Sequence, residues 1–90
     1  MAIVIVPTPM QQLTGGQRKV EVDGQTLGEC LDRLEDLYPG VRERLVDEAG
    51  EIQPHINIFV SGEDARTLQD LHTRVRPDDE IMIVPAVGGG

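Results

Sequence analysis

The sequence predicts an α+β fold in which a mixed sheet of four to five strands carries one main helix on one face. The order of the patterns supports this class, because two strands, one helix and two further strands follow one another along the chain. The first and last strands are the most continuously apolar, which is typical of central strands in a sheet. The segment between the two pairs of strands is a clear amphipathic helix.

The first two strands are predicted to form a hairpin with a long connection. Residues 2–6 are a continuous run of Ala, Ile and Val, which are mostly strand formers. Residues 18–22 alternate, with Val20 and Val22 on the face opposite the charged positions, as in a half-buried strand. Residues 13–17 contain a pair of glycines and are predicted to be a loop within the connection.

The main helix is predicted to begin at Thr26 and to end at Pro39-Gly40. Thr26 is a favourable N-cap, and Glu29, three residues later, makes a capping box. Glu29 also precedes Arg33 by four residues, which is the favourable order for an ion pair. The predicted apolar stripe of this helix consists of Leu27, Cys30, Leu31, Leu34 and Leu37.

A short helical turn and irregular segments are predicted beyond the main helix. The turn contains Val41, Leu45 and Val46. Residues 47–54 are acidic and loop-like, and residues 65–76 follow no single period, with Leu68 and Leu71 as their predicted core anchors.

The remaining two strands are predicted at residues 55–60 and 81–84. The third strand alternates, with three residues facing inward: Ile56, Ile58 and Val60. The last strand is apolar throughout and follows a turn at residues 77–80. If the first and last strands are central, they lie side by side and parallel. This arrangement, with the helix across one face, is the β-grasp fold.

Composition restricts the classes of function. The chain of 90 residues can form one small domain with one modest core. It contains one Tyr, one Phe and no Trp, so it offers no aromatic platform on which nucleic-acid bases could stack. The formal net charge of −8 opposes binding to nucleic acid and to anionic membranes. The same charge would attract a basic protein partner, or it would simply keep a small domain in solution.

Reactive side chains are few. The single cysteine, Cys30, cannot form an internal disulfide, and its place on the apolar stripe favours packing over a persulfide-carrying role. His55 and His72 have no partner residues at metal-ligand spacing, so we expect no metal site. We expect no signal peptide, because the first residues lack a basic start, a long apolar stretch and a cleavage site, and no apolar run approaches the ~20 residues of a membrane helix. We therefore expect a soluble, cytoplasmic protein.

The chain ends on Gly88-Gly89-Gly90, directly after the last strand and a Pro85-Ala86-Val87 spacer. Glycine accepts almost any backbone angles, so such a tail can lie extended in a narrow channel with its last carbonyl open to attack. A frayed terminus or an expression remnant is the alternative interpretation. The predicted boundaries are a β-grasp domain at 1–84 and a flexible C-terminal glycine tail at 85–90.

Four segments resemble the ubiquitin-like sulfur carriers, a family that includes the small subunit of molybdopterin synthase and the thiamine-pathway sulfur carrier. The segments are Thr26-Leu27-Gly28 with Leu31 and Leu34, His55-Ile56-Asn57-Ile58 with Val60, Asp78-Asp79-Glu80-Ile81, and Pro85-Ala86-Val87-Gly88-Gly89-Gly90. The resemblance spans essentially the whole chain. Thr14-Gly15-Gly16-Gln17 and the tail look most similar to the branch that supplies sulfur for cysteine synthesis from O-phosphoserine.

The resemblance implies a carrier protein and not an enzyme. A ubiquitin-activating-type adenylyltransferase would join the Gly90 carboxylate to AMP from ATP, and a sulfur donor would then leave a thiocarboxylate on Gly90. The partner-binding part of the tail would be Pro85, Ala86, Val87, Gly88 and Gly89. The chain itself would bind no cofactor and no metal, because the activating partner uses the ATP.

The sulfur acceptor implied by the nearest branch is a cysteine-synthase-like enzyme, which indicates a role in cysteine biosynthesis. A role as small subunit beside the large subunit of molybdopterin synthase, or as carrier of another thiolation pathway, is the alternative. A ubiquitin-like modifier joined to lysines through Gly90 and a plain interaction domain are also open. We expect the free carrier to be a monomer that docks through the apolar sheet surface near the last strand.

Overall fold

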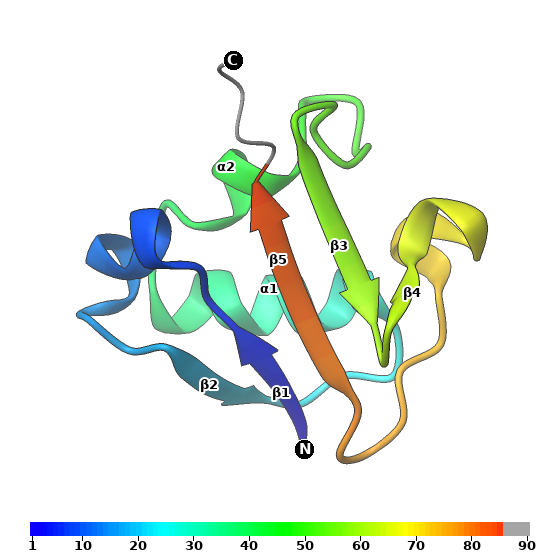
Figure 1. Ribbon diagram of the computed structural model, residues 1–90, viewed down its shortest axis with the longest axis horizontal. Coiled ribbons are helices and arrows are strands. Elements are labelled where there is room, and N and C mark those ends of the chain that lie inside the picture. Colours follow the sequence, from blue (N-terminus) through cyan, green and yellow to red (C-terminus); the bar gives the residue numbers. More distant parts are fainter. Residues whose placement is uncertain (86–90) are drawn as a thin grey trace.

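The computed structural model describes residues 1–85, and its elements follow the predicted order (Figure 1). Neighbouring strands lie in the order β2-β1-β5-β3-β4. β1 and β5 pair in parallel, whereas the other neighbours are antiparallel, so the predicted mixed sheet is confirmed. The strands are β1 (Ala2–Ile5), β2 (Lys19–Val22), β3 (Ile56–Val60), β4 (Glu63–Asp64) and β5 (Glu80–Pro85).

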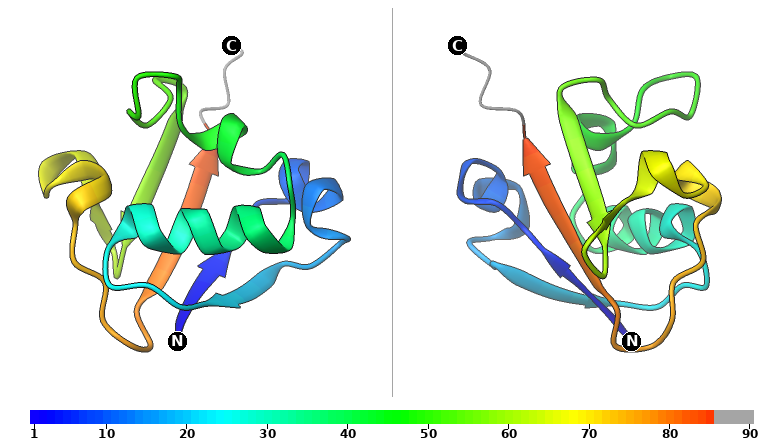
Figure 2. Two further views of the ribbon diagram at one scale, coloured as in Figure 1. Left: turned by 180° about the vertical axis from the view of Figure 1, so that it is seen from behind. Right: turned by 45° about the vertical axis from the view of Figure 1, so that its right-hand side comes forward.

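One face of the sheet is covered by α1 (Leu27–Leu37), and no described helix crosses the other face (Figure 2). The predicted start of α1 is confirmed, because the N–H of Glu29 donates to Thr26 Oγ1 at 3.2 Å. The Glu29 carboxylate in turn accepts the N–H of Gln25 at 2.9 Å. The shorter helical elements are α2 (Arg42–Leu45), η1 (Thr8–Thr14), η2 (Ala65–Thr67) and η3 (Asp70–His72).

The core lies between α1 and the sheet. Alternate strand residues face α1, and Val4, Ile58 and Ile81 are each 0% exposed. Leu27 and Leu34 meet them from the helix and are equally buried. Each apolar side chain of this size stabilises the fold by about 1.5–3 kcal/mol when it is removed from water. The alternation seen in the sequence therefore decides which face of the sheet becomes the core.

Two predictions for the main helix are wrong. Leu37 is 57% exposed, because the helix ends there, beyond the part of the stripe that the sheet covers. Arg33 pairs with Asp36 at 2.8 Å and not with Glu29. The carboxylate of Glu29 is engaged instead with the backbone before the helix, so it is not held for a pair with Arg33.

The irregular segments also differ from the prediction. Leu68 is 39% exposed, and the buried anchors of its segment are Ala65 and Val75. Leu71 is partly buried against the core, as expected. The connection between the first two strands contains the 3-10 helix η1, which was not expected from the sequence and which reaches into the expected loop at 13–17. η1 forms there because Met10 and Thr14 pack into the interior.

Candidate functional site

The predicted site starts at the end of β5, and Pro85 is the one predicted site residue within the described part of the chain. β5 includes Pro85, one residue beyond the predicted domain boundary, and Pro85 is opposite Ile56 at the start of β3. Ala86, Val87, Gly88, Gly89 and Gly90 lie outside the described residues. Proline is tolerated at this position because a strand end needs no further N–H for the ladder.

β5 holds the root of the tail between two neighbouring strands. It pairs with β1 as far as Met82, which is opposite Ile5, and with β3 as far as Pro85. Beyond Met82 the β1 side of β5 is unpaired, because the chain leaves β1 for η1 at this level (Figure 1). The last residues of β5 are therefore anchored on one edge and open on the other.

The sheet face that no helix covers carries an apolar surface beside this strand end. Register places Ile5, Met82 and Phe59 in one row across three strands. Met82 in the middle of the row is 42% exposed. Contiguous exposed apolar side chains commonly mark a contact with another protein. We call this surface the open-face patch and define it by Ile3, Ile5, Phe59, Met82 and Val84.

A docking face near the last strand was expected from the sequence, but the residues that the other strands contribute to it were not. β1 and β3 supply Ile3, Ile5 and Phe59, whose outward positions follow from the buried alternation of their neighbours. The sequence did contain a signal for the apolar surface on β1. Residues 2–6 are an unbroken apolar run, whereas a strand with one solvent-exposed face should alternate between apolar and polar residues. The row of Ile5, Met82 and Phe59 depends on the register between strands that are distant in the sequence. No local sequence pattern predicts that register.

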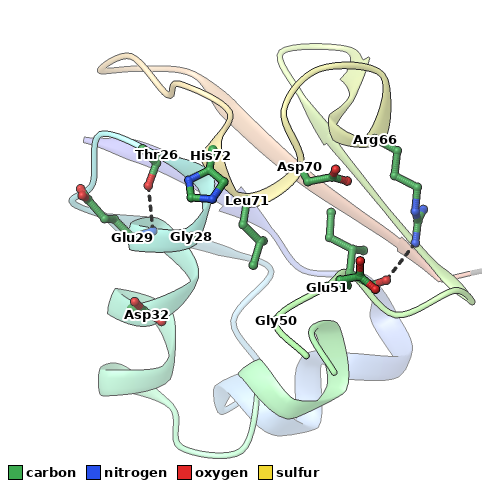
Figure 3. Close-up of a pocket in the computed structure, with 11 residues that line it drawn as sticks. Thr26, Gly28, Glu29, Asp32, Gly50, Glu51, Arg66, Asp70, Leu71 and His72 are labelled. Atoms are coloured by element: carbon green, nitrogen blue, oxygen red, sulfur yellow. Dashed lines mark hydrogen bonds between the residues drawn. The ribbon is translucent and has the colours of Figure 1, made fainter. Parts of the chain in front are cut away.

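A hollow of about 730 Å³ lies away from this surface, among α1, the loop at 50–52 and η3 (Figure 3). Several of its polar groups have structural partners. The Arg66 guanidinium donates to the carbonyls of Ile52 at 3.3 Å and Gln53 at 2.6 Å. Asp32 accepts from Arg42 at 2.9 Å, and Thr26 caps the helix. These hydrogen bonds stabilise the local fold. None of them pairs a nucleophile with a general base.

The single cysteine is part of the core. Cys30 is 0% exposed, and its burial raises the pKa of the thiol to about 11, with smaller contributions from the charges of Glu29 and Asp23. A thiol with this pKa stays protonated at neutral pH and is a poor nucleophile. The prediction that Cys30 packs in the interior is confirmed.

The other candidates for chemistry lie on the surface. His55 and His72 are both exposed. Among residues 1–85, no three side chains of His, Cys, Asp or Glu gather as a metal site would require. Every helix in the same range is too short or too polar to span a bilayer.

Comparisons with known proteins agree with the fold. The model of the ThiS family matches residues 4–90. The sulfur carrier protein CysO of Mycobacterium tuberculosis is 40% identical over 89 residues, which cover 97% of this chain and 96% of CysO. The small archaeal modifier protein 1 of Haloferax volcanii is 36% identical over 73 residues, covering 80% of this chain and 79% of that protein.

Comparison with solved structures also agrees with the fold. A chain from the Amycolatopsis orientalis BexX/CysO complex matches with a TM-score of 0.95 and 37% identity, covering 100% of both chains. Crystalline CysO of M. tuberculosis matches with a TM-score of 0.92 and 38% identity, over 97% of this chain and 100% of that one. The predicted β-grasp fold is confirmed, and family members act as substrate proteins and not as enzymes. The chain belongs to the ThiS family of sulfur carriers.

Proposed function

We propose that this protein carries sulfur as a thiocarboxylate on Gly90 and delivers it for cysteine biosynthesis. The observation that carries the proposal is the position of Pro85, at the end of a strand paired with β3, directly before a segment that ends on Gly88-Gly89-Gly90. The identity of 40% to CysO over nearly the whole of both chains supports the cysteine pathway.

Activation of Gly90 needs a partner enzyme, because hydroxide leaves a carboxylate poorly. A ubiquitin-activating-type adenylyltransferase would join the carboxylate to AMP at the expense of ATP. A sulfur donor would then attack the carbonyl carbon, so that a C–S bond forms and the C–O bond to phosphate breaks, with AMP leaving. Cys30 cannot be that donor, since its thiol is buried and protonated. The sulfur therefore comes from free sulfide, which gives the thiocarboxylate directly, or from the persulfide of another protein, whose S–S bond a further thiol then has to break to release the thiocarboxylate.

The proposed tail, residues 85–90, has the reach for this chemistry. The five residues after Pro85 span at most about 17 Å, at roughly 3.3–3.6 Å each. Gly90 can therefore enter a partner's tunnel of that depth while Pro85 stays in the sheet. The folded body contributes positioning, which is a large part of the rate when a reacting group is held in place. Because activation uses ATP, we place the cycle in the cytoplasm.

We propose the open-face patch as the surface that docks on the adenylyltransferase. It lies beside the strand that leads to the reacting end, and its centre is uncharged. A relative of this chain, CysO of A. orientalis, occurs in a complex with BexX. For the second step we propose a cysteine-synthase-like sulfur acceptor. The large subunit of molybdopterin synthase is the alternative acceptor.

A role as a protein modifier is the second candidate. The small archaeal modifier proteins 1 and 3 of H. volcanii are 36% and 34% identical to this chain. The activation step would be the same, but the activated Gly90 would be joined to a lysine of another protein. Conjugates that resist reducing agents and migrate as larger species distinguish this role from sulfur transfer.

The test is the intact mass of the protein isolated from its own cells without thiol-reactive reagents. We expect a species heavier by one exchange of oxygen for sulfur, mapped to Gly90 by fragmentation of the C-terminal peptide. A variant that lacks Gly89 and Gly90 is the matched control and should stay unmodified. An unmodified mass for the full chain, unchanged by ATP, sulfide and cell extract, would remove the carrier role.

A further inference from the structure

The chain holds very few side chains that could react with its own activated end. An acyl adenylate is attacked readily by amines and thiols. Of the eight basic residues in the sequence, Lys19 alone carries an amine, and the others are arginines. A guanidinium stays protonated and is not a nucleophile. Cys30 is buried. Lys19 is therefore the side chain of this protein with which the activated Gly90 could form a stable bond.

The structure places Lys19 on the same face of the sheet as the open-face patch. It is the first residue of β2, it is exposed, and it is opposite Ile5. Ile5 is in turn opposite Met82, so Lys19, Ile5 and Met82 form one row across β2, β1 and β5. Within residues 1–85, Lys19 Nζ forms no hydrogen bond or ion pair. The amine is therefore available.

Lys19 is also within reach of the protein's own C-terminus. Two strand spacings separate β2 from β5, which is roughly 10 Å. Pro85 lies three residues beyond the level of Met82, which adds roughly 10 Å along the strand. The diagonal of about 14 Å is shorter than the ~17 Å that the five residues after Pro85 can span. The four-carbon stem of the lysine extends the reach further.

We propose that Lys19 is an acyl acceptor for the activated C-terminal glycine. The inference rests on the proposed function, because Gly90 has to be activated first. The neutral Nζ attacks the Gly90 carbonyl carbon, a C–N bond forms, and the C–O bond to phosphate breaks. AMP leaves with the electron pair of that bond, and the proton of Nζ passes to the solvent. The product is an amide between Gly90 and Lys19.

In this role, Lys19 competes with the sulfur donor for the activated carbonyl group of Gly90. An adenylated chain that meets no sulfur loses its free carboxylate to Lys19 and leaves the carrier cycle. Because Lys19 continues the row of Ile5 and Met82, a partner that covers the open-face patch also shields the amine. Sulfur transfer is thus favoured while the chain is docked, and capture by Lys19 is favoured once the activated chain is released.

The test activates the full chain chemically, without any partner enzyme. The protein is released from an intein as a Gly90 thioester and incubated at mildly alkaline pH. We expect a product lighter than the free acid by one water, with a peptide that links Gly90 to Lys19. A monomeric product would identify the chain's own tail as the donor, and a linked pair of chains would identify a second copy. Either product supports the acceptor site.

The matched control is the double variant K19R/R76K, which has the same composition and charge as the native chain. Arg76 is exposed and precedes β5, so its amine would lie at the opposite end of the strand from Pro85. We expect about tenfold slower amide formation in this variant, because the tail no longer places the carbonyl beside an amine. Equal melting temperatures would show that both proteins are folded.

Equal rates of capture in the two proteins, a link at another residue, or hydrolysis alone would overturn the proposal. None of these results would affect the proposed function. A thiocarboxylate on Gly90 would still be found in protein from cells, since that experiment does not depend on Lys19.

Discussion

At the scale of single residues, the missing Cβ of Gly24 decides how closely the chain can approach α1. A Cβ added at Gly24 would lie 2.8 Å from both the backbone N and the Sγ of Cys30. We expect Gly24→Ala to lower the free energy of unfolding by about 1–3 kcal/mol, as overpacking of an interior does. Urea unfolding followed by circular dichroism measures this loss.

The companion variant Cys30→Ala tests which contact causes the loss at Gly24. It removes Sγ but leaves the backbone N of residue 30 in place. We therefore expect the double variant G24A/C30A to be no more stable than G24A. Recovery to the stability of Cys30→Ala alone would show that the thiol, and not the backbone, sets the limit at this position.

At the scale of elements, hydrogen bonds to the side chain of Glu35 connect α1 to the start of α2. Its carboxylate accepts the N–H of Gly40 at 2.9 Å and the N–H of Arg42 at 2.9 Å. These hydrogen bonds, with that of Gly40 first, lower the pKa of Glu35 below its ordinary value of 4.5. A carboxyl group whose pKa is lowered by folding stabilises the protein above the unfolded pKa. That stabilisation is lost as the pH falls through the lowered pKa.

The expected consequence is a pH-dependent effect of Glu35→Gln. We expect the variant to melt below the native protein at pH 7, where the native carboxylate is charged. At pH 3 the gap should narrow, because the unfolded chain binds a proton at Glu35 below the ordinary pKa of 4.5, whereas the native carboxylate resists protonation. Thermal melts at both pH values check this, with Glu43→Gln on the exposed surface of α2 as control. A gap that is constant from pH 7 to pH 3 would contradict the assigned hydrogen bonds.

Successive residues of β5 face the core and the open face in turn, so one set of side chains stabilises the fold and the other is available for docking. Met82 is 42% exposed on the open face, whereas Ile83 is 2% exposed in the core. We expect Met82→Glu to change stability by no more than about 0.5 kcal/mol. The same change should abolish thiocarboxylate formation on Gly90, because it puts a charge in the centre of the open-face patch.

Ile83→Ala is the control for this prediction. We expect it to cost about 2–5 kcal/mol in unfolding free energy, since it removes buried carbon from a packed interior. Thiocarboxylate formation should persist in whatever fraction stays folded. If Met82→Glu formed the thiocarboxylate at the native rate, the open-face patch would not be the docking surface.

The elements that could be predicted from the sequence are those with a local physical cause. Thr26 and Glu29 cap α1 through neighbouring backbone groups, so the helix start was visible in four residues. Leu37 was misplaced because a helical period alone does not say where the opposing surface ends, and Leu68 was misplaced because its segment follows no period that would assign side chains to the core. The strand at 81–84 was predictable from its apolar run, although β5 extends one residue further at each end. The row of Lys19, Ile5 and Met82 was not, because it exists only after distant strands pair in register.

At the scale of the whole molecule, the uncharged open-face patch is bordered by charged side chains, because Glu21 and Glu80 lie opposite Ile3 and Lys19 lies opposite Ile5. The formal net charge is −8, yet the five side chains that define the open-face patch carry none of it. Such a distribution assigns different tasks to the two surfaces. The acidic surroundings attract a basic partner over distance, and the patch provides the contact that holds it.

This division predicts how the two kinds of variant alter binding to the adenylyltransferase. Glu48→Gln with Glu51→Gln removes two exposed charges outside the patch. We expect the association rate to fall about two- to fivefold at low salt, with little change in dissociation. Raising the salt should slow the native protein toward the variant, because screening removes the same attraction. Stopped-flow association across a salt series measures both effects. Met82→Glu should instead increase the rate of dissociation. If the association rate of the native chain did not change with salt, its net charge would have no part in finding the partner.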